Sequence, residues 1–179
     1  MKSKVCILIC VLSLIIWSCS NMSATSTMGA SQPQDSALNL TLSLDKNVYK
    51  STEFIKVSLS LGNVGDERVV VKKRLAPNYQ FLDESVRDVV FLIKDPHGNT
   101  VVFNGYSQVP ALRDDYFIVL GPNESFEHIY SDIKAFYDLS EPGEYTIQAI
   151  YENKSDPSNN WVAWKGTLLS NVVTFTIEP

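Results

Sequence analysis

The sequence contains no cysteine beyond residue 19, because its three cysteines are Cys6, Cys10 and Cys19. A domain built from the later residues can form no disulfide, so its hydrophobic core alone must stabilise it. The same absence excludes a cysteine nucleophile and a thiolate metal site from that part of the chain. The length allows such a core, since a domain of about 150 residues buries roughly 68–70 % of its unfolded surface.

Histidine is almost as scarce, with only His97 and His128 in the chain. Their separation is not typical of a pair of metal ligands. The sequence also lacks the Gly-x-Ser-x-Gly elbow that presents the nucleophile of α/β-hydrolases. We therefore expect a protein without catalytic residues, metal or cofactor, in which both histidines lie on the surface.

Positive charge is in short supply, with 15 Lys and Arg against 20 Asp and Glu and a formal net charge of −5. This balance argues against nucleic acid as a partner and against electrostatic adhesion to a membrane. The acidic groups lack the spacing of a calcium-binding loop. We interpret the local charge clusters as solvated loops and strand edges: Asp83-Glu84 with Asp88, Asp114-Asp115, and Lys72-Lys73-Arg74.

No stretch reaches the roughly 20 apolar residues that a transmembrane helix needs. The apolar run from Val5 to Trp17 has 13 residues, interrupted only by Ser13. Lys2 and Lys4 precede it. A short apolar run behind positive charge is typical of an export signal.

The end of this run, Ile16-Trp17-Ser18-Cys19, resembles the lipobox of bacterial lipoproteins, with an aliphatic residue three before the cysteine and a small residue one before it. The resemblance implies cleavage before Cys19, a diacylglycerol on its sulfur and a fatty acid on the new N-terminus. Two or three acyl chains hold a protein at a membrane almost permanently. The alternative is a simple secretory signal with an unmodified cysteine.

These features predict residues 1–18 as a lipoprotein signal peptide and residues 19–37 as a lipidated N-terminus with a flexible, Ser/Thr-rich tether. Residues 38–179 then form the folded domain. Loss of the signal would change the formal net charge to −7, because Lys2 and Lys4 leave with it. The lipobox places the protein in a bacterial cell envelope, and Ser20 favours the outer membrane if the source is Gram-negative.

Hydrophobic residues alternate with polar ones from Leu38 to Leu44 and again from Ile55 to Leu61, which predicts two half-buried strands. The nearly continuous apolar run Val89–Lys94 predicts a central strand covered on both faces. A turn at residues 95–99 and a return strand at Thr100–Phe103 predict a hairpin. Further strands are expected at residues 68–73, 116–120, 125–130, 145–151 and 171–177, with a helical turn within 131–139.

About eight or nine short strands without a long helix predict an all-β fold, an antiparallel immunoglobulin-like (Ig-like) β-sandwich. The stretch Pro142-Gly143-Glu144-Tyr145 resembles the tyrosine corner of such sandwiches. Tyr145 would be the corner residue, and Ile147 would occupy the place of the inter-sheet cysteine of antibody domains.

Trp161 and Trp164 lie beside a long polar loop that precedes them, with Tyr151 upstream. Two tryptophans beside a loop can form a platform that stacks on a sugar or binds a protein. The alternative is that at least one of them packs in the core. Both residues are candidates for a binding surface.

Several turn motifs together resemble the bacterial proteinase-inhibitor family known as BsuPI, whose members are small Ig-like sandwiches. The motifs are Leu61-Gly62-Asn63-Val64-Gly65-Asp66, Asp95-Pro96-His97-Gly98-Asn99 with Val101-Val102-Phe103, Leu120-Gly121-Pro122-Asn123-Glu124-Ser125, and Pro142-Gly143-Glu144-Tyr145. The resemblance implies an Ig-like fold and raises protease inhibition as a possible activity, without assigning inhibitory residues.

The sequence thus predicts a membrane-anchored lipoprotein that presents a non-catalytic, protein-binding Ig-like domain at the cell envelope. Its expected contacts are the membrane, through Cys19, and another envelope or extracellular protein. Two alternatives stay open: a BsuPI-like protease inhibitor, and a carbohydrate-binding or hydrolytic envelope lipoprotein.

Overall fold

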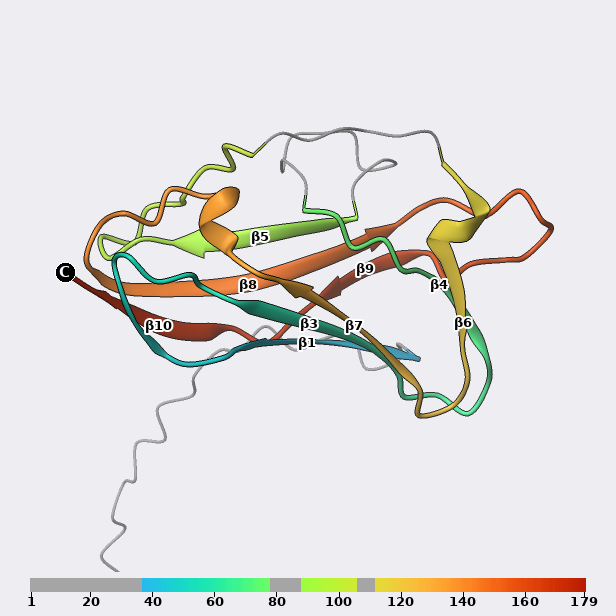
Figure 1. The fold of residues 1–179 in the computed structure, drawn as a ribbon. Helices are drawn as coiled ribbons and strands as arrows, with labels where there is room; N and C mark the ends of the chain where they lie inside the picture. The colour runs from blue at the N-terminus through green and yellow to red at the C-terminus, as the bar shows by residue number, and fades with distance from the viewer. Residues whose placement is uncertain (1–36, 78–87, 106–111) are drawn as a thin grey trace, which may run out of the picture.

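The computed structural model describes residues 37–77, 88–105 and 112–179. The predicted signal peptide, Cys19, the tether up to residue 36 and the acidic pair Asp83-Glu84 lie outside the described residues. Figure 1 shows two facing layers of strands, with one end of the molecule closed by a separate strand pair.

One layer is a three-stranded antiparallel sheet with the order β1-β3-β7. Its strands are β1 (Leu38–Leu44), β3 (Val57–Asn63) and β7 (Ser125–Tyr130). The side chains of β1 and β3 alternate between the interior and the outer face, as their period-two sequences predict. Central strand β3 therefore presents a polar outer face and an apolar inner face.

The second layer has five strands, ordered β2-β10-β8-β5 with β9 pairing β8 as well. Strand β8 is long enough to pair with β10 along its first half and with β9 along its second. Strands β2 and β10 run parallel, whereas the other pairings in this layer are antiparallel. The bounds are β2 (Val48–Lys50), β5 (Val89–Lys94), β8 (Gly143–Asn153), β9 (Gly166–Leu169) and β10 (Val173–Glu178).

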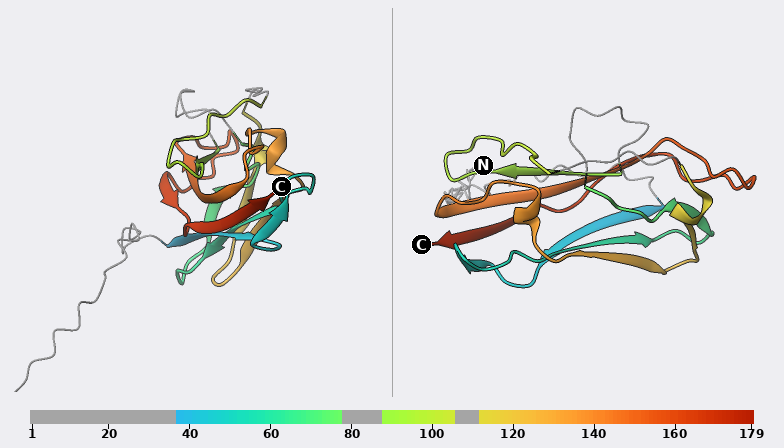
Figure 2. Two further views of the ribbon diagram at one scale, coloured as in Figure 1. Left: turned by 90° about the vertical axis from the view of Figure 1, so that its left-hand side faces the viewer. Right: turned by 45° about the horizontal axis from the view of Figure 1, so that its top comes forward.

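Strands β4 (Val69–Lys72) and β6 (Phe117–Leu120) form an antiparallel pair that runs between the two layers at one end of the molecule (Figures 1 and 2). A short 3₁₀ turn, η1 (Asp114–Tyr116), precedes β6. Another, η2 (Ile133–Ala135), follows β7, inside the segment predicted to contain a helical turn. The prediction of an all-β sandwich is confirmed: β1, β3 and β7 occupy the places of Ig strands A, B and E, and β5, β8 and β10 those of C, F and G.

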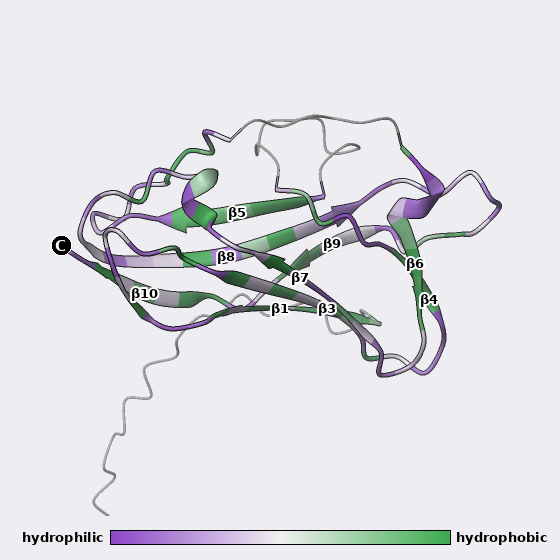
Figure 3. Ribbon diagram, viewed as in Figure 1, coloured by the Kyte–Doolittle hydropathy of each residue, from purple (hydrophilic) through white to green (hydrophobic). Residues whose placement is uncertain are grey.

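The hydrophobic core lies between the layers, and Figure 3 shows β5 almost wholly in the hydrophobic colour. Both layers supply leucine, isoleucine, valine and aromatic side chains that are at most 5 % exposed. They include Leu40, Leu42, Leu59, Leu61, Phe91, Ile93, Tyr130, Tyr137, Ile147, Tyr151 and Phe175. Ile147 of β8 is fully buried in this core.

Two polar side chains hold the corners of the sandwich. Asn63 is 1 % exposed, and its amide nitrogen donates to the carbonyl oxygens of Glu67, Leu120 and Gly121 at 2.7, 3.0 and 3.1 Å. At the opposite end, the Tyr145 hydroxyl donates to the carbonyl oxygen of Glu141 at 2.8 Å. A tyrosine corner makes this bond to upstream backbone.

The predicted hairpin is wrong in its second half. The turn forms, with Asp95 N donating to Asn99 O, but the return segment makes only isolated bridges, Lys94 with Thr100 and Phe103 with Tyr137. Phe103 instead stacks on Phe136 next to η2, with ring centroids 6.1 Å apart. The segment still bonds to β5, through Val101 N and Ile93 O, but does not continue as a strand beside it.

The prediction that β5 is a central strand is right about its faces and wrong about its place. Its faces are largely buried, yet it is the last strand in the order β2-β10-β8-β5. Isolated contacts cover its outer edge, because Pro77 bridges Val89 and Val101 N donates to Ile93 O. The structure has ten strands in its described part, since β2 and β9 form where no strand was predicted.

Candidate functional site

The loop between β8 and β9, residues 154–165 and here called the Trp161 loop, exposes two adjacent apolar side chains. Trp161 is 44 % exposed and Val162 is 81 % exposed. The loop projects beyond the rest of the sandwich at the end that carries β4 and β6 (Figures 1 and 2). An aromatic and an aliphatic side chain are therefore exposed on a protruding loop, whose outer part is called the tip.

Hydrogen bonds give the Trp161 loop a defined shape. The carboxylate of Asp156 accepts from Ala163 N at 3.0 Å and pairs with the ammonium of Lys165. Ser158 donates to Asp114 of η1 from its backbone N at 2.6 Å and from its hydroxyl at 2.8 Å. These bonds connect the loop to itself and to the segment before β6, so the tip is positioned by the fold.

The two predicted tryptophans do not form one platform. Trp164 is partly buried, and its ring stacks on the buried ring of Tyr151 with centroids 5.9 Å apart. Gly166 has a φ of +153°, and a Cβ there would lie 2.8 Å from the Trp164 ring. The structure thus places Trp164 against the core, in line with the alternative prediction for one of the pair, and leaves Trp161 at the surface.

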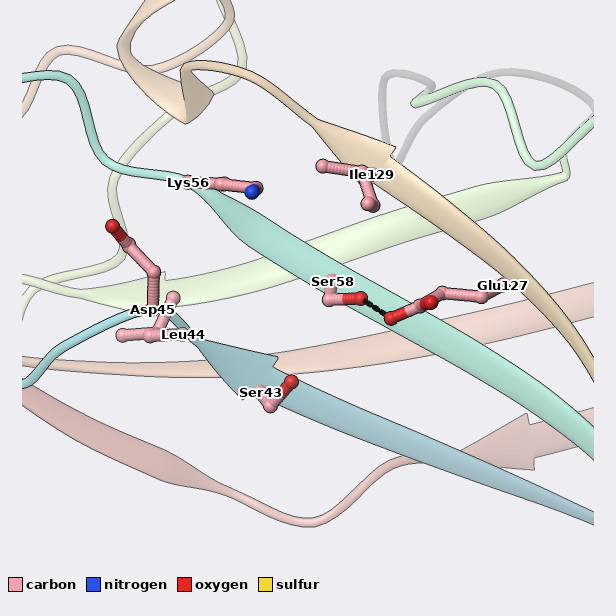
Figure 4. Close-up of a pocket in the computed structure, with 7 residues that line it drawn as sticks. All are labelled: Ser43, Leu44, Asp45, Lys56, Ser58, Glu127 and Ile129. Atoms are coloured by element: carbon pink, nitrogen blue, oxygen red, sulfur yellow. Dashed lines mark hydrogen bonds between the residues drawn. The ribbon is translucent and has the colours of Figure 1, made fainter.

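A second candidate surface is a shallow hollow of about 180 Å³ on the outer face of the three-stranded sheet (Figure 4). The Ser58 hydroxyl donates to the Glu127 carboxylate within it. The half-exposed side chain of Ile129 contributes an apolar wall. Its lining comes from all three strands and the segments beside them: Ser43, Leu44, Asp45, Lys56, Ser58, Glu127 and Ile129.

The sheet around this hollow carries mostly small polar side chains. Cross-strand partners include Thr41 with Ser60 and Ser43 with Ser58. Short side chains lose little conformational entropy when a partner orders them. The flat face with its single hollow is suited to contact with another macromolecule more than to enclosing a small molecule. Sequence alternation predicted a polar outer face but gave no sign that three strands would combine into this hollow.

A buried ion cluster lies between β4 and the start of β5. The Asp88 carboxylate is fully buried, 2.5 Å from the ammonium of Lys72 and hydrogen-bonded to the guanidinium of Arg74. Lys72 is 2 % exposed. The interpretation of Asp88 and Lys72 as solvated charge is therefore wrong, because the fold brings opposite charges together where neither would be stable alone.

Tyrosines surround this cluster. The Tyr130 hydroxyl donates to the carbonyl oxygen of Leu75 at 2.5 Å, and the Tyr151 hydroxyl donates to that of Lys72 at 3.1 Å. Burial, together with the nearby Asp88 charge, raises the pKa of both phenols far above the usual tyrosine range. Both hydroxyls therefore stay protonated and act as structural donors.

Neither of the two histidines lines the hollow or belongs to the Trp161 loop. His97 is exposed and its Nε2 lies 2.7 Å from Glu141, whose hydrogen bond and charge raise the pKa of the imidazole. His128 packs edge-on against Tyr130, with ring centroids 4.6 Å apart, and burial lowers its pKa. His97 fits the prediction of a surface residue, whereas His128 is only partly exposed.

The acidic pair Asp114-Asp115 is at the surface, where Arg113 pairs with Asp115 at 2.9 Å. Within residues 37–77, 88–105 and 112–179, no three His, Cys, Asp or Glu side chains gather as a metal site would require. Across the same ranges, no helix has the length and apolar character to cross a membrane.

Comparisons with known proteins add little to this picture. No protein-family model and no curated protein sequence matches the chain. Among solved structures, a β-glucosidase from Erythrobacter marinus is similar at 17 % identity and a TM-score of 0.34. The match covers 79 % of this chain and 15 % of that enzyme. A TM-score this low assigns neither fold nor activity.

Proposed function

We propose that this chain is a lipid-anchored envelope lipoprotein whose Ig-like sandwich binds another protein without catalysis. The anchor rests on Ile16-Trp17-Ser18-Cys19 behind a signal-like apolar run. The proposed binding role rests on one observation: the outer face of β1-β3-β7 has a hollow that is lined in part by Ile129. The chemistry of this face is that of recognition: small hydroxyl side chains, one apolar side chain and charges of both signs.

The face has the features that make a protein interface favourable. Ile129 is 51 % exposed and can serve as a central apolar contact. Lys56, Asp45 and Glu127 surround it with charges that select for a partner of complementary pattern. Because β3 holds the middle of the sheet and is paired on both sides, the face needs little rearrangement on binding.

Site-specific crosslinking in intact cells tests this role. A photoreactive benzophenone amino acid at Ser58 of the full-length chain should capture a discrete protein partner. The same residue at Thr174, an exposed hydroxyl position on β10 of the other sheet, is the matched control and should capture none. Ile129→Asp should reduce the Ser58 adduct by roughly tenfold or more, since a hot-spot contact is worth at least about 1–2 kcal/mol.

The outcomes separate the alternatives. A captured protease would favour inhibition, and purified chain should then reduce its activity. Equal labelling from Ser58 and Thr174, or no labelling from either, would show that this face is not a protein-binding surface. Retention of the chain on a glycan column, abolished by Trp161→Ala, would favour the carbohydrate-binding alternative instead.

A further inference from the structure

The Trp161 loop and the first strand begin at the same end of the sandwich. Ala37, the first described residue, accepts hydrogen bonds from Val64 N and Gly65 N in the turn between β3 and β4. Strand β4 then reaches the loop, because Val70 bridges Ala163 and accepts from Trp164 N at 2.8 Å. The C-terminus lies at the far end (Figures 1 and 2). Chain that precedes Ala37 therefore attaches at the same end of the sandwich as the Trp161 loop.

The tip is apolar and locally neutral on an acidic protein. Trp161 and Val162 supply the exposed apolar surface. Residues 112–116 and 154–165 together hold three acidic and three basic side chains: Arg113, Asp114, Asp115, Lys154, Asp156 and Lys165. Two of the basic groups are already paired, Arg113 with Asp115 and Lys165 with Asp156. The Trp161 loop and η1 therefore carry no net charge of their own that would oppose their close approach to a phospholipid surface.

We propose that the Trp161 loop docks on the lipid bilayer that holds the chain, with Trp161 and Val162 inserted at the level of the headgroups. This inference rests on the proposed anchor at Cys19. Tryptophan is enriched at membrane–water interfaces, where its apolar ring and polar N–H are both accommodated. The serine and asparagines at residues 158–160 are compatible with hydrated headgroups.

Because the chain before the domain is short, even a weak contact between the Trp161 loop and the bilayer can hold the domain against the membrane. The 17 residues between Cys19 and Ala37 span on the order of 20–25 Å if they are flexible. A short tether of this kind gives an effective concentration of the order of millimolar at the membrane. Insertion of two side chains can then be substantially populated, although the same tip would bind free vesicles poorly.

Docking would orient the sandwich. The end with β4 and β6 would face the lipid, and the opposite end would point away from it (Figure 1). The outer face of β1-β3-β7 runs along the length of the sandwich, so it would stand upright and stay accessible to a partner. The membrane contact and the proposed protein contact therefore use different surfaces.

Tryptophan quenching by lipid tests the proposal. The chain from Cys19 to Pro179 has one thiol, Cys19, and two tryptophans, Trp161 and Trp164. Coupling Cys19 to a maleimide lipid in phosphatidylcholine vesicles with brominated acyl chains supplies the anchor chemically. We expect Trp164→Phe, in which Trp161 alone reports, to lose roughly half of its emission relative to unbrominated vesicles, because interfacial tryptophan approaches the acyl chains. Trp161→Phe should lose much less.

Matched charge variants locate the contact. Val162→Asp in the Trp164→Phe background should abolish most of the quenching. Val48→Asp, at a half-exposed valine of β2 next to the C-terminal end of β10, should leave it unchanged. Circular dichroism would verify that each variant is folded.

Unquenched Trp161 emission in the coupled, folded protein would overturn the proposal. If envelope proteins then shifted that emission in vesicles without bromine, the tip would be a protein-binding site instead. Because the anchor here is chemical, failure of natural lipidation at Cys19 would leave this result unchanged. The two hypotheses can therefore fail separately.

Discussion

Single residues show how strongly the interior of this sandwich depends on one carboxylate. Asp88 is fully buried between Lys72 and Arg74, and Lys72 itself is 2 % exposed. Asp88→Asn removes the charge that compensates Lys72 while keeping the shape of the side chain. We expect a loss of about 3–5 kcal/mol in the free energy of unfolding, measured by urea denaturation, because a buried charge is left without its partner.

Two further variants separate this electrostatic effect from a general loss of packing. Lys72→Met in the Asp88→Asn background removes the orphaned ammonium and should recover much of the stability. Asp156→Asn breaks an exposed pair with Lys165 and should cost less than about 1 kcal/mol. Equal losses for Asp88→Asn and Asp156→Asn would show that the buried cluster has no special role.

The two histidines should give opposite pH dependences. The folded pKa of His97 is raised by Glu141, so its contribution to stability is present below the unfolded value, about 6.5, and is lost as pH rises through the folded pKa. The folded pKa of His128 is lowered by burial, so its contribution is lost as pH falls below about 6.5. His97→Gln should therefore lower the Tm relative to wild type more at about pH 5.5 than at about pH 8. His128→Gln should instead lower the Tm relative to wild type more at about pH 8 than at about pH 5.5. A proton NMR titration in which His128 titrates above His97 would contradict these pKa directions.

Residue roles were predictable where local sequence determines them. The Pro-Gly turn before Tyr145 is a local motif, and the Tyr145 hydroxyl does bond to Glu141 in the fold. Asp88 and Lys72 are 16 positions apart, so nothing local distinguishes their charges from solvated ones. The position of Trp164 likewise depends on its stacking against Tyr151 of β8, a contact that local sequence does not reveal.

Among the elements, strands with a clear hydrophobic pattern were predictable, whereas the short strands β2 and β9 were not. β1 and β5 match their predicted bounds at Leu38–Leu44 and Val89–Lys94. β2 has three residues and β9 has four, which is too few for a periodic signal in the sequence. Both form by pairing with longer strands, β2 with β10 and β9 with β8. The return segment of the predicted hairpin bonds to β5 at Thr100 and Val101 without forming a strand, and Phe103 at its end stacks on Phe136.

The link between β9 and β10 also protects a sheet edge. The Asn171 side chain accepts from Leu42 N and donates to Leu42 O, both at 2.9 Å, so it caps backbone groups on the free side of β1. Asn171→Ala should destabilise the fold by about 1–2 kcal/mol and increase self-association, since exposed edge strands pair with other chains.

Asn171→Asp is the matched variant for this edge. Its carboxylate can still accept from Leu42 N but can no longer donate to Leu42 O, so we expect it to be at least as destabilised as Asn171→Ala. Chemical denaturation and analytical ultracentrifugation provide the two measurements. Unchanged stability and an unchanged sedimentation profile in both variants would contradict the capping role.

As a whole molecule, the described chain is a sandwich with two differentiated ends and one polar sheet face. One end combines the Trp161 loop with the start of β1, and the other carries the Tyr145 corner and the C-terminus. Composition and alternation were sufficient to predict the sandwich itself. They could not predict which loops share an end, because that depends on how β4 and β6 connect the layers. We propose that this polarity orients the sandwich relative to a membrane anchor at Cys19.

Metabolic labelling with palmitate tests that anchor most directly. The wild-type chain expressed in a bacterial host should incorporate the label and fractionate with membranes. Cys19→Ala should lose both properties, because in our proposal acyl chains on Cys19 supply the membrane affinity. Cys10→Ala is the matched control and should behave as wild type. Persistent labelling of Cys19→Ala, or an unlabelled wild-type chain released from the membrane, would contradict the account.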